Sequence, residues 1–206
     1  MKALFVDACV RGTSSRTRQL ARCFLNELLK LAPDWDLSVQ DLGAMALQPL
    51  NAESLLHREQ LCNTHAWGDP SLKPAVEFQQ ADAVVIAAPY WDLCFPAALK
   101  VWVERMYVRN LTFVYRDDKP VGLCRARAAV YLTTAGSPIG DNDWGTGYLR
   151  AVTQMLGIPA FFSVKAEGLD LYGADADSIL STACEEARKA AACLIRAVNA
   201  EKEQGF

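Results

Sequence analysis

Hydroxyl side chains near the start of the chain stand where a phosphate could be bound. Residues 4–6 form a short apolar run that suits a buried parallel strand, and the pattern changes at Asp7. A loop of small and hydroxylated residues follows, and Ser15 and Thr17 begin an amphipathic helix. The start of a helix directs unpaired backbone N–H groups and the positive end of the helix dipole toward the loop. A phosphate bound there, after a first parallel strand, indicates a nucleotide or a flavin.

The type of loop limits which phosphate it could hold. Neither the G-x-G-x-x-G pattern nor the G-x-x-x-x-G-K-[ST] pattern is present. A Ser/Thr loop without a lysine suits one terminal monophosphate. The alternative is a capped helix with no ligand at its start. Either way, apolar residues at intervals of four and three place one buried stripe on this helix: Leu20, Phe24, Leu28 and Leu31.

Composition and charge exclude several classes of protein. A chain of 206 residues is long enough for one domain with a sizeable core, so we expect a single domain over residues 1–206. The net charge of -3 predicts no bulk attraction to nucleic acid or to an anionic membrane, although Arg11, Arg16 and Arg18 gather on the proposed phosphate loop. No apolar run approaches the ~20 residues of a membrane span, and no signal-peptide pattern precedes the first strand. We therefore expect a cytoplasmic protein.

The cysteines and histidines indicate neither a disulfide framework nor a metal site. The seven cysteines are scattered and never in C-x-x-C spacing. Cys184 and Cys193 fall in an alanine-rich helical pattern and are interpreted as small core residues. His57 and His65 are the two histidines, and both are expected to be exposed. Two histidines make a His-rich metal site or a Ser-His-Asp triad hard to build.

Alternating strand and helix patterns predict an α/β fold with a doubly wound, five-stranded parallel sheet and helices on both faces. The expected strands are residues 4–6, 37–42, 83–88, 128–134 and 160–164, the second of them nearest the sheet edge. A first helix is expected directly after the first loop, and a second crossover helix is expected to end with residues 76–82. The other expected helices cover residues 51–65, 96–106, 146–156 and 176–200. A short apolar piece at 111–115 ends in a turn at 116–120. Ligands of such sheets bind beyond the carboxyl ends of the strands, so the loops after strands one, three and four should converge on one crevice.

Two of these loops carry further candidate binding residues, each with a structural alternative. The third strand ends at Pro89, and the adjacent Tyr90 and Trp91 could form an aromatic wall or pack on the next helix. Asp92 could cap that helix. Trp144 could fill the core or line the pocket.

Several motifs resemble those of a known family. The segment A-P-Y-W-D-L-C-F-P-A-A-L-K at 88–100 is similar to the A-P-M-Y-N-F-x-I-P-x-x-L-K segment of the FMN-dependent NAD(P)H:quinone oxidoreductases and azoreductases, which have the flavodoxin-like fold. S-S-R-T at 14–17 stands at the family's Ser-rich phosphate loop, and L-T-F-V-Y at 111–115 and A-E-G-L at 166–169 are also in register. The resemblance covers almost the whole chain and is weakest between residues 43 and 75.

The resemblance implies that FMN is the cofactor, and it implies a role for each matching residue. The residues that would hold the phosphate are Ser15, Arg16 and Thr17, with Cys9 beside them. The residues that would lie against the flavin ring are Pro89, Tyr90, Trp91, Asp92 and Leu93 on one loop and Thr134, Ala135, Gly136 and Ser137 on the other. Phe113 and Tyr115 would reach the substrate from a neighbouring subunit. Trp144 is a further candidate substrate residue, which rests on its own position in the loop and not on the resemblance. The chain departs from the family at Cys9, where serine is usual, and after Gly136, where a second glycine and a histidine are missing.

The implied activity is an FMN-dependent oxidoreductase that transfers two electrons from NADH or NADPH to quinones and/or aromatic azo compounds, in a ping-pong cycle with hydride passing through flavin N5. An apolar rim of Tyr90, Trp91, Phe113 and Tyr115 favours a homodimer with active sites at its interface. Two alternatives remain: a flavodoxin-like electron carrier, or a flavin-free binding protein of the same fold. Such carriers are usually small and strongly acidic, and this chain is neither.

Overall fold

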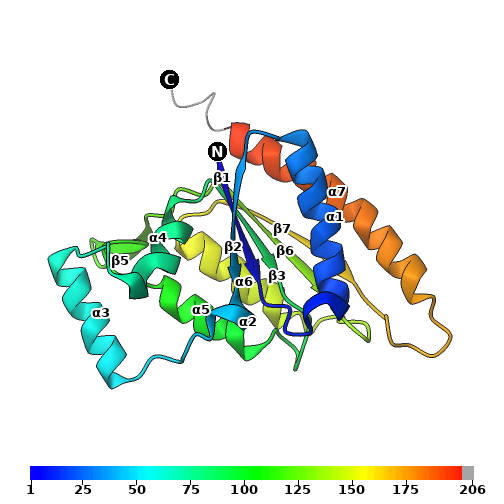
Figure 1. Cartoon of the computed structure of the whole chain (residues 1–206), viewed down its shortest axis with the longest axis horizontal. Helices are drawn as coiled ribbons and strands as arrows, with labels where there is room; N and C mark the ends of the chain where they lie inside the picture. Colours follow the sequence, from blue (N-terminus) through cyan, green and yellow to red (C-terminus); the bar gives the residue numbers. More distant parts are fainter. Residues whose placement is uncertain (201–206) are drawn as a thin grey trace.

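A five-stranded parallel sheet forms the centre of the molecule in the computed structural model, which describes residues 1–200 (Figure 1). Its strands are β1 (Lys2–Asp7), β2 (Asp36–Asp41), β3 (Ala83–Ala87), β6 (Ala128–Thr134) and β7 (Ala160–Ala166). The order β2-β1-β3-β6-β7, with every neighbouring pair parallel, confirms the predicted flavodoxin-like sheet and its edge strand β2. A single domain over 1–206 stays a prediction, and residues 201–206 lie outside the described residues.

The sheet is buried because helices cover both of its faces (Figure 1). Helices α1 (Arg16–Leu31) and α7 (Ala176–Ala200) pack on one face, and α4 (Lys73–Gln80), α5 (Ala97–Met106) and α6 (Trp144–Met155) on the other. The central strands β3 and β6 are buried at every residue, which explains why β3 is apolar throughout and β6 is apolar up to its two final threonines. In α1 the stripe of 20, 24 and 28 is buried as expected, but Leu31 is 47% exposed because it ends the helix.

The remaining helices are short or lie at the margin of the fold. They are α2 (Leu42–Met45), α3 (Ala52–Thr64) and the 3-10 helices η1 (Gly12–Ser14) and η2 (Pro70–Leu72). Helix α3 begins with a capping box between Asn51 and Ser54 and stands at the left edge of Figure 1. Within residues 1–200, no helix combines the length and apolarity needed to cross a membrane.

A β-hairpin was missed by the sequence analysis. Strands β4 (Phe113–Arg116) and β5 (Lys119–Gly122) pair antiparallel, so the expected apolar piece and turn together make a second, two-stranded sheet. Asp117 and Asp118 form the tight turn with φ of 49° and 59°, the left-handed conformation that two-residue hairpin loops need. Strand β5 was not predicted because it contains Pro120, and proline is depleted in strands and tolerated only at sheet edges.

The expectation that no disulfide forms is wrong. Cys23 of α1 is bonded to Cys184 of α7, with 5.5 Å between their Cα atoms. The two cysteines are 161 residues apart, so no local spacing signals the pair. They meet because both helices pack on the same face of the sheet. Cys184 is buried, as expected of a core position. It also forms half of a covalent link between the first long helix, α1, and the last, α7.

Candidate functional site

A crevice lies beyond the carboxyl ends of the parallel strands, where the loops after β1, β3 and β6 converge as predicted. It has a volume of about 170 Å³. Its lining residues are Val10, Arg11, Ser14, Ser15, Arg16, Thr17, Pro89, Tyr90, Trp91, Thr134, Gly136 and Asp170. The first six come from a single loop and helix start, which makes one end of the crevice polar and cationic.

The loop after β1 turns sharply to present the start of α1. Gly12 has φ of +57°, which glycine adopts without strain, and the 3-10 turn Gly12–Ser14 follows. Ser15 caps α1 by accepting a hydrogen bond from the backbone N–H of Arg18 at 3.2 Å. The N–H groups of Arg16 and Thr17 are the first of the helix and have no intrahelical acceptor. They are donors available to an anion, strengthened by the helix dipole.

A buried carboxylate braces this loop from below. Asp7 is 4% exposed, and its Oδ1 accepts a hydrogen bond from the Cys9 N–H at 2.9 Å. Its Oδ2 lies 2.7 Å from Nε of Arg18, whose Nη2 also contacts Asp41 at 3.3 Å. The end of β1, the loop and the first turn of α1 are therefore held together by one charged network.

Two buried threonine hydroxyls meet at the floor of the crevice. Thr17 Oγ1 and Thr134 Oγ1 are 2.6 Å apart, and either can be the donor. Whichever hydroxyl donates within the pair, the other keeps its own proton for a further acceptor. This contact joins the loop after β1 to the end of β6.

The Cys9 thiol is buried and does not line the crevice. Its side chain is 4% exposed, its Sγ points at the Ala87 carbonyl at 3.7 Å, and it is absent from the crevice lining. Burial, and then the neighbouring Asp7 carboxylate, raises the pKa of the thiol to about 12. Cys9 is thus a neutral thiol at neutral pH, and its sulfur lies within hydrogen-bond reach of the crevice residue Ser15.

The loop after β3 carries its donors at its tip. The N–H of Tyr90 donates to the Thr134 carbonyl at 2.9 Å and that of Trp91 to the Cys94 carbonyl at 3.3 Å, so these two amides are already used. The amides of Asp92 and Leu93 find no acceptor within residues 1–200. Both residues have left-handed φ, 50° and 66°, which is unusual for a leucine and marks a constrained tip.

The alternative reading of Asp92 as a helix cap is wrong, because α5 begins at Ala97 after Pro96 and has no side-chain cap. Tyr90 closes the crevice instead of packing on α5. Its hydroxyl donates to the Asn142 carbonyl at 3.0 Å and thereby joins the loops after β3 and β6.

The loop after β6 is held by the loop after β7. The Ala135 N–H donates to the Ala166 carbonyl at 2.8 Å, and the Gly136 carbonyl accepts from the Asp170 N–H at 2.9 Å. A Cβ on Gly136 would lie 2.3 Å from Asp170 Oδ2, so a larger residue there would displace the Asp170 carboxylate. Ala135 and Ser137 fall outside the crevice lining, while Asp170 belongs to it. Asp170 was missed although it directly follows the A-E-G-L motif at 166–169.

The predicted substrate residues lie apart from the crevice within one chain. Phe113 and Tyr115 stand on the β4–β5 hairpin, on the opposite side of the molecule from α1 (Figure 1). The expected single rim formed with Tyr90 and Trp91 is therefore wrong for an isolated chain. Trp144 is 63% exposed at the start of α6, which excludes the core alternative.

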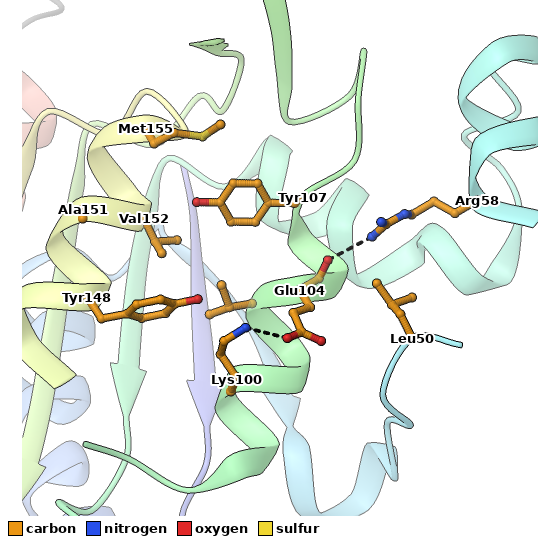
Figure 2. Close-up of a pocket in the computed structure, with 10 residues that line it drawn as sticks. Leu50, Arg58, Lys100, Glu104, Tyr107, Tyr148, Ala151, Val152 and Met155 are labelled. Atoms are coloured by element: carbon orange, nitrogen blue, oxygen red, sulfur yellow. Dashed lines mark hydrogen bonds and ion pairs between the residues drawn. The ribbon is translucent and has the colours of Figure 1, made fainter. Parts of the chain in front are cut away.

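A larger cavity of about 560 Å³ lies between α5 and α6, on the sheet face opposite to α1 and α7 (Figure 2). Tyr107 and Tyr148 point their hydroxyls into it from opposite sides, and Val152 and Met155 supply apolar walls. Lys100 and Glu104 form an ion pair at its edge. Burial raises the pKa of Tyr107, so this phenol stays neutral.

The crevice suits a flavin monophosphate at its polar end. Two helix N–H groups, serine and threonine hydroxyls, and an arginine converge there, the donor set that a phosphate needs. Pockets that enclose a whole ligand usually measure ~300–1,000 Å³. At about 170 Å³ the crevice can enclose the phosphate end, and a ring system would lie against the exposed Trp91.

The comparisons with known proteins agree with this geometry. A family model of the flavodoxin-like fold matches residues 1–191. An FMN-dependent NADH:quinone oxidoreductase of Clostridium acetobutylicum is 32% identical over 197 residues, 92% of this chain and 98% of that protein. One from Clostridium beijerinckii is 31% identical over 193 residues, again 92% and 98% of the two chains. The structure of an FMN-dependent NADH-azoreductase from Bacillus anthracis, in complex with FMN, has a TM-score of 0.82 at 22% identity, covering 94% of this chain and 98% of that one.

Sheet order, loop positions and family model together define a protein of the flavodoxin-like class. Within that class, the similarity to curated relatives over nearly the whole length is decisive. The chain belongs to the family of the FMN-dependent NADH:quinone oxidoreductases.

Proposed function

We propose that this protein is an FMN-dependent oxidoreductase that transfers two electrons from NADH or NADPH to quinones and/or aromatic azo compounds. The observation that carries the proposal is the meeting of a phosphate-type helix start with an aromatic loop in one crevice, in a chain that matches an FMN-dependent NADH:quinone oxidoreductase over 92% of its length. An electron carrier or a flavin-free binding protein has no comparable support. A cytoplasmic location stays a prediction.

When bound, FMN would supply the hydride and two-electron chemistry that a ping-pong cycle between nicotinamide and acceptor requires. The protein's own part is placement. The N–H groups of Arg16 and Thr17 and the hydroxyls of Ser15 and Thr17 would hold the phosphate. The free amides of Asp92 and Leu93 would donate to the polar edge of the ring.

The walls of the crevice would fix the ring in position. Pro89, Tyr90 and Trp91 form one wall, and Thr134 and Gly136 the other. The hydrogen bond between Tyr90 and Asn142 would hold the two walls at a constant separation. No side chain needs to act as an acid or base in the hydride steps.

A homodimer with sites at its interface completes the proposal. Tyr148 on α6 lines the α5–α6 cavity and contacts Phe95 at the end of the loop after β3, with ring centroids 5.7 Å apart, so this cavity lies next to a loop that also forms the crevice. Trp144 stands one turn before Tyr148 on the same side of α6, so its exposed ring extends the apolar surface of the cavity along this helix. A surface of this kind favours association with a second copy.

Phe113 and Tyr115 would then reach the acceptor in the partner's crevice. Their rings contact each other with centroids 5.7 Å apart, and Tyr115 is 61% exposed. Tyr115→Phe should change acceptor kinetics and leave the flavin content unchanged. Unchanged kinetics with several acceptors would remove this role.

The test is the visible spectrum of the protein after loading with FMN and removing the excess, followed by anaerobic addition of NADH or NADPH. We expect flavin absorbance near ~450 nm that bleaches with nicotinamide and recovers with a quinone or an azo compound. Retained flavin that ignores nicotinamide would indicate an electron carrier. Absence of retained flavin would contradict the proposal. A monomeric mass with full activity would contradict the dimer alone.

A further inference from the structure

Three arginines lie on the loop after β1 and the first turn of α1, and two of them are already engaged with carboxylates. Arg18 contacts Asp7 and Asp41 below the loop. Arg16 reaches sideways, donating from Nη2 to Asp170 Oδ1 at 2.8 Å and from Nη1 to the Leu169 carbonyl at 3.1 Å.

The partner of Arg16 is held in place by its own backbone. Asp170 donates its N–H to the Gly136 carbonyl, and its carboxylate occupies the space that a Cβ on Gly136 would take. Arg16 therefore ties the start of α1 to the loops after β6 and β7. An arginine neutralised by a carboxylate contributes little net attraction to an incoming phosphate.

Arg11 is in a different position. It lines the crevice and is exposed, and its side chain has neither an ion pair nor a hydrogen bond within residues 1–200. Its backbone is fixed, because its carbonyl accepts a hydrogen bond from Ser14 Oγ at 2.9 Å. A guanidinium that is free of carboxylates can form two parallel charge-assisted hydrogen bonds with a phosphate.

We propose that Arg11 supplies the positive charge for the FMN phosphate, whereas Arg16 and Asp170 form a clasp that positions the crevice wall. This inference rests on the proposed function. It assigns to Arg11 the charge that the family resemblance places on Arg16, and it leaves the backbone N–H of Arg16 as a phosphate donor. The site would thereby distinguish FMN from riboflavin, which lacks the phosphate.

The experiment titrates the apoprotein with FMN and with riboflavin and follows flavin fluorescence, for the wild type and for Arg11→Gln and Arg16→Gln. Arg11→Gln should weaken FMN binding about tenfold or more and leave riboflavin binding unchanged, since it removes a charge-assisted hydrogen bond to phosphate. Arg16→Gln should lower the affinity for FMN and for riboflavin by the same factor. Arg22→Gln, at an exposed position of α1 away from the crevice, is the matched control and should change neither.

Asp170→Asn provides a second, independent comparison. If Asp170 positions the crevice wall through its ion pair with Arg16, Asp170→Asn should lower the affinity for both flavins as Arg16→Gln does. The double variant Arg16→Gln/Asp170→Asn should then bind both flavins no more weakly than either single variant. Tighter FMN binding by Asp170→Asn, or an FMN-specific loss in Arg16→Gln with none in Arg11→Gln, would overturn the inference. Equal wild-type affinity for the two flavins would overturn it while leaving a flavin site in place. Binding of neither flavin would overturn the proposed function as well.

Discussion

The crevice and the α5–α6 face of the molecule differ in how far a single chain completes them. In the crevice, hydrogen bonds and ion pairs join the loops after β1, β3, β6 and β7 to one another. Across the α5–α6 face, a cavity of about 560 Å³ stays open, and Trp144, one helical turn before the lining residue Tyr148, is 63% exposed. Polar groups can satisfy each other within one chain, whereas apolar side chains gain free energy only when something covers them. The difference supports a phosphate site made by one chain and a substrate site made by two.

Met155→Glu should have the largest effect, and it acts on the α5–α6 face. An unpaired carboxylate in a dimer interface costs several kcal/mol, enough to convert a dimer to a monomer. FMN binding should persist, because the crevice belongs to one chain. The measurements are mass in solution and flavin titration. Gln154→Glu, exposed on the same helix, is the matched control. An unchanged dimer would show that this face is not the interface.

Gly122→Ala should impair the function of the β4–β5 hairpin without affecting that of the crevice. A Cβ on Gly122 would lie 2.0 Å from the Leu156 carbonyl carbon, so the backbone of one segment must move, at a cost on the order of 3 kcal/mol in the free energy of unfolding. Displacing the hairpin should raise KM for the acceptor and leave FMN affinity unchanged. Gly147→Ala on α6, with no atom within 4 Å of its Cβ, should stabilise the protein slightly. A loss of FMN affinity equal to the loss of acceptor binding would contradict the separation.

Removing the disulfide tests the stability of the crevice side, because α1 carries the phosphate loop. Cys23→Ser should lower the free energy of unfolding by about 3 kcal/mol, since the link closes a long loop in the unfolded chain. Denaturant unfolding with and without dithiothreitol measures this. Cys193→Ser, a cysteine outside the disulfide, is the control. Equal unfolding midpoints for wild type and Cys23→Ser under oxidising conditions would show that the link contributes nothing.

The effect that is smallest near neutral pH concerns Cys9, because its raised pKa changes stability only in alkaline solution. Its folded pKa is about 12, above the ordinary thiol value of 9.0, so only the unfolded chain ionises between these values. Its contribution to stability is complete below pH 9 and is lost as pH rises, by about 1.4 kcal/mol per unit. Unfolding of the wild type should therefore show a steeper loss above pH 9 than that of Cys9→Ser. Identical pH profiles would mean that the thiol is not held neutral.

The fold was predictable from the sequence because its signals are local. The uninterrupted apolar segments of β3 and β6 can only be buried strands, and the stripe at Leu20, Phe24 and Leu28 can only face a core. Once strands and helices alternate, the handedness rule brings the loops to one edge of the sheet. The positions of Ser15, Tyr90 and Thr134 in one crevice followed from that rule.

The partners of individual side chains were not predictable. Cys23 and Cys184 are 161 residues apart, and Arg16 finds Asp170 across 154 residues of chain. Nothing near either residue records these contacts. The hydrogen bonds of the Tyr90 and Trp91 amides were not predictable either, because their acceptors depend on the exact path of the loop.

The sequence alone determined the sheet, the position of the crevice and the kind of group that its polar end can hold, because periodicity, capping and apolar runs act over a few residues. Only the tertiary structure decided which donors remain free, which arginine is already paired, and that Phe113 and Tyr115 stand apart from the crevice. These features depend on distances between segments remote in sequence, and such distances are set by packing of the whole fold.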